Sequence, residues 1–518
     1  MPPGADFPAE LVRGIRQLSK GQAPEILARS FIVVNTQRMK RRITSLFAKG
    51  PATFLPKIIT LADLSLMPGA PIGQKPANTI ARRIELARLI ERLIGAEPDL
   101  ASLDSVFDLA DSLASLIDEM HGEGVSVETI QQLDVSDQSG HWARAQQFIG
   151  IAETYVASAD MSPDPEAAQR NLVTQMIANW QENPPQTPII LAGSTGSRGT
   201  MALLMQAVAK LPQGAVVLPG FDFDAPSETW VQLGDPLTGE DHPQFRFSRL
   251  IKLLGLKPAS VLPWLDQSAP YPDRAKVVSL ALRPAPFTDA WLDEGPGLGD
   301  LPSAVNGLSL IEAKTAREEA LSIAVRLRQA AEDGQTAALI TPDRMLTRQV
   351  SAALDRWDIV PDDSAGLPLH LSPPGRLIRQ IAELYLTPVR SDALIALLKH
   401  PLTHSGVDRG EHLGMTRKLE LVLRKKGPPF PTIDWVSSIP EFSGTNWTKW
   451  LQHWFLNALE DSEKPLSNWV EELCQSAEAI AGGVDAPDSG GLWQQAAGRS
   501  LRGILDELAV ADRLEQGM

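Results

Sequence analysis

Apolar and amphipathic segments alternate at the start of the chain. Residues 31–34 are apolar and mostly β-branched, which is typical of a short buried strand, and residues 57–61 predict a second strand. Between them, apolar residues recur at helical spacing from position 37 to position 49. Because a strand, a helix and a second strand in this order usually form part of a parallel sheet, we expect an α/β fold.

The strand pattern returns much later, at residues 188–192 and 215–218, on either side of a helix predicted over 199–210. The residues between the two strand-rich regions have helical periodicity instead. The sequence therefore predicts a parallel sheet that is interrupted by a helical insertion. The helices expected in this insertion cover 80–95, 103–121, 141–158 and 165–183.

A third α/β stretch is predicted after a turn-rich region. It begins with a strand at 308–312 and continues with a helix at 316–332, a strand at 337–340 and a helix at 345–357. Beyond residue 375 or so, the pattern is helical to the end of the sequence.

Composition narrows the class of protein. Hydrophobic residues make up 43% and charged residues 21% of the 518 positions, as in ordinary globular proteins. Cys474 is the single cysteine, which excludes an intrachain disulfide and a cysteine-rich metal site within these residues. There is neither a signal peptide nor an apolar run long enough to cross a membrane. We expect a cytoplasmic protein.

The charge is unevenly distributed. The formal net charge of −15 disfavours nucleic acid as a partner, since phosphate binding requires Lys and Arg. Residues 1–60, however, contain ten basic and three acidic side chains, whereas residues 101–130 contain seven acidic and no basic ones. This segregation suits a protein that binds DNA along one surface, but also many proteins that bind none.

The loop 193–199 lies between a predicted strand and a predicted helix, where backbone N–H groups can bind phosphate. Its glycines, Gly193, Gly196 and Gly199, do not have the dinucleotide spacing, and no Walker A motif occurs in the chain. We favour a tight structural turn over a nucleotide site, which stays the enzymatic alternative.

Two acidic patterns also admit a catalytic interpretation. Asp222 and Asp224 follow a predicted strand, as metal-binding acids do in ATPases, but they sit in a Pro-Gly turn. Asp300 with Glu312 and Lys314 resembles a nuclease motif, although Asp300 lies in a turn. We favour structural turns over catalysis for both, and assign no catalytic residue and no metal ligand.

Basic and aromatic residues give two further candidates. Arg38, Lys40, Arg41 and Arg42 open the first predicted helix, where contact with phosphate and a solvated helix face are equally good interpretations. Trp447, Trp450 and Trp454 share one helical face. Such side chains can stack on unpaired bases, but a helical aromatic stripe belongs more often to the core. The histidines His121, His141, His242, His400, His404 and His453 lack ligand spacing.

Several segments together resemble the AddB subunit of AddAB helicase–nucleases, in its alphaproteobacterial form. The resemblance covers nearly the whole chain and is most specific at 192–198 and 218–224. The other segments that carry it are 2–11, 33–42, 55–64, 108–120, 241–247 and 338–348.

This resemblance implies RecA-like domains of the superfamily-one helicase type with large helical insertions. The first domain would comprise 1–70 and 184–300, split by an insertion at 71–183. Residues 301–375 would form the first part of a second domain, and residues 376–518 a helical insertion that follows it. Pro2-Pro-Gly-Ala5 stands where an active helicase carries its Walker A motif, so the resemblance implies a helicase half without ATP hydrolysis.

The implied function is DNA binding during the repair of double-strand breaks by recombination, in a heterodimer with an AddA-type helicase–nuclease. Family subunits are about twice as long, and their later half carries the nuclease carboxylates for Mg²⁺ and the cysteines of an iron–sulfur cluster. We therefore expect a truncated chain without a cofactor of its own, with ATP bound by the partner. A fragment that only docks on a partner is the other alternative. The residues expected to contact DNA are Arg38, Arg41, Arg42, Ser194, Thr195, Arg198 and Arg344.

Overall fold

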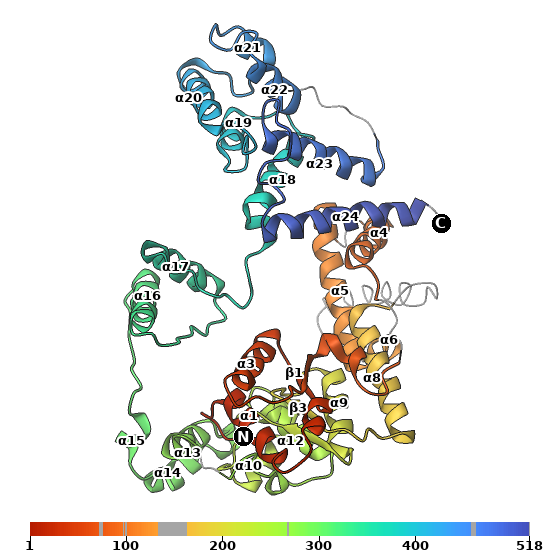
Figure 1. Cartoon of the computed structure of the whole chain (residues 1–518), viewed down its shortest axis with the longest axis vertical. Helices are drawn as coiled ribbons and strands as arrows, with labels where there is room; N and C mark the ends of the chain where they lie inside the picture. The colour runs from red at the N-terminus through yellow and green to blue at the C-terminus, as the bar shows by residue number, and fades with distance from the viewer. Residues whose placement is uncertain are drawn as a thin grey trace. The chain divides into compact units, whose positions relative to one another are not determined.

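A computed structural model describes residues 1–71, 76–96, 98, 101–132, 163–266, 269–456 and 463–516. The chain divides into two compact units, residues 1–309 (unit 1) and 310–518 (unit 2). Figure 1 shows the sheet of unit 1 surrounded by helices, and unit 2 as a helical assembly.

Unit 1 contains a four-stranded sheet in which all strands are parallel. Its order is β2 (Lys57–Thr60), β1 (Phe31–Val34), β3 (Ile189–Ala192) and β4 (Gly214–Val217). The crossovers contain α3 (Gln37–Ala48) between β1 and β2, and α9 (Gly199–Lys210) between β3 and β4. The predicted α/β class with a parallel sheet interrupted by helices is confirmed.

Helices cover both faces of this sheet because the two central strands are apolar at every position. On one face, Phe31, Val33, Ile189 and Leu191 pack against α9 and α8 (Pro165–Glu182). On the other face, Ile32, Val34, Ile190 and Ala192 pack against α1 (Phe7–Leu18) and α3. The sheet is therefore wound on both sides, with α3 and α9 on opposite faces.

The helical insertion consists of α4 (Thr79–Ala96), α5 (Val106–Glu123), α6 (Val127–Gln131) and α8. The helix predicted at 141–158 lies outside the described residues. Apolar residues such as Leu86, Ile90, Leu113 and Ile117 join α4 to α5. Next to them, the guanidinium of the buried Arg82 donates hydrogen bonds to the carboxylate of Asp118 and to the carbonyl of Ala114.

The remaining helices of unit 1 are short, and most of them follow β4 in the sequence. Their bounds are α2 (Pro24–Arg29), η1 (Leu61–Leu66), η2 (Leu103–Ser105), α10 (Ser227–Gln232), α11 (Pro236–Gly239), α12 (Phe245–Leu253), η3 (Pro258–Ser260), α13 (Pro272–Ala281), η4 (Ala285–Phe287), α14 (Ala290–Glu294), η5 (Gly295–Gly297) and α15 (Leu301–Val305).

The first part of unit 2 differs from the α/β stretch that the sequence predicts there. The predicted helices form as α16 (Ala316–Glu332) and α17 (Arg344–Leu354), and they pack on each other. The strands predicted at 308–312 and 337–340 do not form, and nearly all of these residues are exposed. A strand requires a hydrogen-bonded neighbour, and among the described residues neither segment has one. Local apolar pattern alone was therefore insufficient to predict a second sheet.

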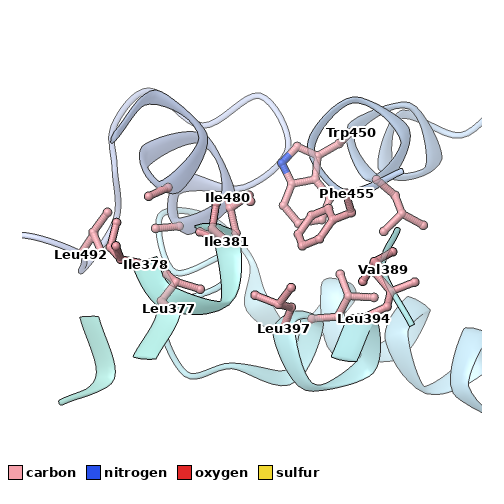
Figure 2. Close-up of a cluster of buried hydrophobic side chains, with 14 of the residues drawn as sticks. Leu377, Ile378, Ile381, Val389, Leu394, Leu397, Trp450, Phe455, Ile480 and Leu492 are labelled. Atoms are coloured by element: carbon pink, nitrogen blue, oxygen red, sulfur yellow. The ribbon is translucent and has the colours of Figure 1, made fainter. Parts of the chain in front are cut away.

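The rest of unit 2 is helical. It contains η6 (Asp355–Trp357), η7 (Leu369–Leu371), α18 (Pro373–Glu383), α19 (Ser391–Lys399), α20 (Arg409–Lys426), α21 (Ile433–Ser437), α22 (Asn446–Phe455), α23 (Leu466–Gly482) and α24 (Ala496–Gln516). Its core joins residues from most of these helices. Figure 2 shows Leu377 and Ile381 of α18 together with Ile480 of α23, and Trp450 of α22 above Leu397 of α19.

Three histidines lie buried in this core. The rings of His404 and His412 stack with centroids 4.6 Å apart, and Trp450 contacts both rings edge-on. His412 donates from Nε2 to the carbonyl of Leu398 and accepts at Nδ1 from the indole N–H of Trp447, which requires a neutral ring. Burial lowers the pKa of His412, and also that of His400, to about 4.

This arrangement predicts that acid destabilises unit 2. The unfolded chain binds protons on His400 and His412 below about pH 6.5, whereas the folded chain binds them only near pH 4. The free energy of unfolding should therefore be constant above pH 6.5 and fall between pH 6.5 and 4. We expect a loss on the order of 1–2 kcal/mol per histidine at pH 5. Urea unfolding followed by tryptophan fluorescence at pH 7 and pH 5 measures this loss.

Two variants identify the source of the pH dependence. His412→Gln keeps a donor and an acceptor but does not titrate, so it should reduce the loss between pH 7 and pH 5. His370→Gln, at an exposed position, should leave the loss unchanged. An equal pH dependence in wild type and His412→Gln would contradict the assignment.

Candidate nucleic-acid interface

The carboxyl ends of β1 and β3 form the centre of the candidate site. The two strands are neighbours, but the helices that follow them, α3 and α9, lie on opposite faces of the sheet. In open parallel sheets, a crevice arises where the crossovers diverge in this way, and it is the usual place for ligands. The segment 35–38 after β1 and the loop 193–198 after β3 both begin at this edge.

Hydrogen bonds join these two segments. The side-chain amide of Asn35 donates to the carbonyl of Gly193 over 3.0 Å. Thr36 accepts a 3.1 Å hydrogen bond from the backbone N–H of Met39 and caps α3. The start of α3 and the loop after β3 are thus held at one place, although more than 150 residues separate them in the sequence.

Residues 1–7 lie along the same edge. The backbone of Met1 is hydrogen-bonded to the carbonyl of Leu218 and to the N–H of Phe221, both just after β4. Gly193 has a φ of +80°, and a Cβ at this position would lie 3.2 Å from the ring of Phe7. Glycine is therefore required here by its backbone conformation and by the close approach of Phe7.

The basic residues at the start of α3 divide into two groups. Lys40 pairs with Asp63 at 3.4 Å, and Arg42 pairs with Asp6 at 3.6 Å. Arg38 and Arg41 are exposed, and Arg41 forms no hydrogen bond or ion pair with the described residues. Of the cations expected to contact DNA in this helix, Arg41 is therefore the most available to a phosphate, while Arg42 has an internal partner.

The loop 193–199 is docked on the helical insertion. The backbone N–H of Gly199 donates to the carboxylate of Glu123 over 2.7 Å, and the hydroxyl of Thr200 donates to the carbonyl of Gly122. Arg198 pairs with Glu166 at 2.6 Å. These contacts fix the end of α5 and the beginning of α8 against the start of α9, so the loop connects insertion and sheet.

This docking bears on the nucleotide alternative. The N-terminal end of α9, where a phosphate would bind, already receives the carboxylate of Glu123. The cavity beside it, lined by Gly196, Ser197 and Arg249, has a volume of about 60 Å³. Small-molecule sites typically occupy roughly 300–1,000 Å³. The geometry favours the structural turn over a nucleotide site.

The other two residues expected in this loop differ in exposure. Ser194 is buried, and its hydroxyl accepts a hydrogen bond from the N–H of Gly196. Thr195 is exposed beside it. Only Thr195 presents a side chain that a ligand at the carboxyl edge can reach directly, while Ser194 shapes the loop.

Asp222 and Asp224 belong to a structural corner. One carboxylate oxygen of Asp222 accepts hydrogen bonds from the backbone N–H groups of Asp224 and Ala225, at 2.9 and 3.0 Å. The side chain of Gln244 is hydrogen-bonded to the backbone of Asp222 and Gly220. Burial, followed by the neighbouring charge of Asp222, raises the pKa of Asp224. These contacts support the interpretation as a turn.

The nuclease-like pattern is not assembled within either unit. Asp300 lies in unit 1, where it accepts from the N–H of Ser303 and caps α15, whereas Glu312 and Lys314 lie in unit 2. Among the described residues, no group of three or more His, Cys, Asp or Glu side chains could hold a metal ion.

Two further candidates lie in unit 2. Arg344 begins α17 and pairs with Asp363 at 3.3 Å. Trp447 and Trp450 are buried and donate hydrogen bonds to His412 and to the carbonyl of Ala479. The interpretation of the tryptophan stripe as core is thus confirmed for these two residues, and Trp454 is half-buried.

Comparison with known proteins adds no identity. A scan against protein-family models finds no match, and no curated protein matches the sequence significantly. Within the described part of the chain, none of the helices combines the length and apolar character that crossing a membrane requires.

Sequence reasoning missed two residues on which the site depends. In the sequence, Glu123 is one of the seven acidic residues of 101–130, and Asn35 simply follows the predicted strand 31–34. Their roles depend on contacts across 76 and 158 positions of sequence. A helix ending in Gly-Glu-Gly, followed far downstream by a glycine-rich loop, is the only local signal, and it does not identify the contact.

The docking of the loop on α5 predicts an unusually sensitive glycine. A Cβ at Gly199 would lie 2.8–2.9 Å from backbone and carboxylate atoms of Gly122 and Glu123. We expect Gly199→Ala to destabilise unit 1 by about 1–3 kcal/mol, as overpacking does. Gly95→Ala is a matched control, since a Cβ there has no neighbour within 4 Å. Thermal unfolding should show a lowered Tm for Gly199→Ala alone, and equal values for both variants would exclude the close contact.

Proposed function

We propose that this chain is a helicase-like, non-hydrolysing DNA-binding subunit of a helicase–nuclease that resects DNA double-strand breaks for recombinational repair. It works in the cytoplasm as a heterodimer with an AddA-type helicase–nuclease subunit that binds and hydrolyses ATP. The resemblance to AddB subunits suggests this role. DNA contact is supported by one observation, the position of the exposed residues Arg38 and Arg41 in the first turns of α3, at the carboxyl edge of the sheet.

Their position suits a polyanion. The guanidinium group binds phosphate through several donors in a fixed plane, and the carboxyl edge at a change of crossover direction is where open α/β sheets bind ligands. Thr195 adds a hydroxyl at the same edge. The carboxylate of Glu123 occupies the start of α9, which favours a role without a nucleotide there.

Binding of the full chain to fluorescent single- and double-stranded DNA at rising salt tests the proposal. The logarithm of affinity should fall linearly with the logarithm of salt concentration, since binding releases counterions from the phosphates. ATPase activity should remain at background, because the chain has no Walker A motif. A folded, monodisperse chain that binds no DNA even at low salt would overturn the proposal.

Variants at the two edges of the sheet localise the contact. Arg38→Ala/Arg41→Ala should weaken DNA binding about tenfold at low salt and reduce the salt slope by roughly two. Arg29→Ala/Lys210→Ala is the control, because Arg29 ends the helix before β1 and Lys210 ends the helix before β4, at the amino edge. The control should bind within about twofold of wild type. Equal losses in both variants would exclude the carboxyl edge as the specific contact.

A further inference from the structure

Helix α20 in unit 2 has a basic surface that the contacts above do not explain. The helix contains six basic and two acidic residues in a chain whose net charge is −15. Four of the cations fall at helical spacing on one face, as the pairs Arg417–Lys418 and Arg424–Lys425, seven positions apart. With the exposed Leu421 between the pairs, they form what we call the α20 basic face.

The opposite side of α20 fixes this face toward solvent. His412, Thr416 and Leu419 are buried, and Leu419 belongs to the core of unit 2. His412 is held from both sides by Leu398 and Trp447. Because these residues project from the other side of the helix, the α20 basic face cannot turn inward. All four cations are exposed.

The internal partners of these cations are few. Glu420 pairs with Arg424 at 2.8 Å and with Lys399 of α19 at 2.6 Å, so one carboxylate serves two cations. Arg417, Lys418 and Lys425 have no hydrogen bond or ion pair with any residue that the structure describes. The face therefore keeps an excess of positive charge.

Helix electrostatics explains only part of this pattern. Cations in the last turn of a helix interact favourably with its dipole, and Arg424 and Lys425 belong to that turn. The effect is confined to the last turn, whereas Arg417 and Lys418 lie two turns earlier. The interaction with the helix dipole therefore does not account for Arg417 and Lys418.

Gly414 points to close contact on the same face. It lies one turn before Arg417 and Lys418, in the interior of α20, where glycine costs roughly 1 kcal/mol relative to alanine. A Cβ at this position would have no neighbour within 4 Å, so packing within the chain does not require glycine. A glycine here leaves the helix backbone without a side chain one turn before the first pair of cations.

We propose that the α20 basic face binds the phosphodiester backbone of DNA, as a contact surface separate from the carboxyl edge of the sheet. The two pairs of cations are about 10 Å apart along the helix, from a rise of 1.5 Å per residue. Phosphates on one strand are spaced by about 3.4 Å along the DNA axis, so the face spans roughly three of them. The contact depends on the charge of the phosphates and has no preference for a DNA sequence. It rests on the proposed function, namely that the chain binds DNA.

Charge reversal in the full chain tests this contact. Arg417→Glu/Lys418→Glu should weaken binding to double-stranded DNA at least tenfold at low salt, and reduce the salt slope by roughly two. The loss should be equal for DNA of unrelated sequences. Arg29→Glu/Lys210→Glu makes the same change of charge at the amino edge of the sheet and should bind within about threefold of wild type. Lys418→Ala/Lys425→Ala, which only removes charge, gives a smaller loss in the same direction and serves if the reversed variant does not fold.

The outcomes separate this proposal from the function on which it rests. If wild type binds DNA and both α20 variants match the control, the α20 contact is wrong while DNA binding by the chain stands. If wild type binds no DNA, both proposals fall. If the α20 variants lose binding to phosphatidylserine vesicles but keep wild-type DNA affinity, the face binds membranes and the proposal is overturned.

Discussion

The parallel pairing of β1 with β3 is the constraint on which unit 1 depends. Phe31–Val34 lies in register with Ile189–Ala192, and both strands are buried at every position. A parallel pair requires a crossover, and here the connection includes α3, β2 and the whole helical insertion. Because the register is fixed by burial on both faces, the ends of the two strands coincide. That coincidence brings Asn35 to Gly193 and places the start of α3 beside the loop after β3.

A second consequence is that the insertion is anchored where such folds often bind an anion. The first N–H groups of a helix need acceptors, and in α9 the acceptor at Gly199 is Glu123, from the end of α5. The same few residues carry the contacts of Thr200 with Gly122 and of Arg198 with Glu166. A negative charge supplied from within the chain thus replaces a ligand, and it couples the orientation of the insertion to the sheet. In this arrangement, the absence of a side chain at Gly193 and Gly199 allows Phe7 and the end of α5 to lie close to the backbone of the loop.

The sequence predicted the sheet of unit 1 well because its information is local. Apolar, β-branched runs bounded by turns marked all four strands within a residue or two, and helical spacing marked α3, α8 and α9. It failed at 308–312 and 337–340, where the same local pattern exists but no neighbouring strand does. For the site, sequence identified exposed cations such as Arg38 and Arg41. It did not identify the partners of Arg42 and Arg198, since ion pairs between distant segments leave no periodic signal.

The overall acidity of the chain is compatible with binding a polyanion because its charges are segregated. In physiological salt, electrostatic interactions between exposed charges are screened over about 8 Å. A bound phosphate therefore interacts with nearby side chains and not with the net charge of −15. Helix α5 contributes acidic residues, two of which, Asp118 and Asp111, pair with Arg82 and Arg83 of α4. Helices α3 and α20, in contrast, carry exposed cations. Acidic surfaces elsewhere repel the same ligand, so the segregation restricts where a nucleic acid can lie. The local excess of positive charge, and not the net charge of the whole chain, therefore decides whether such a surface can bind DNA.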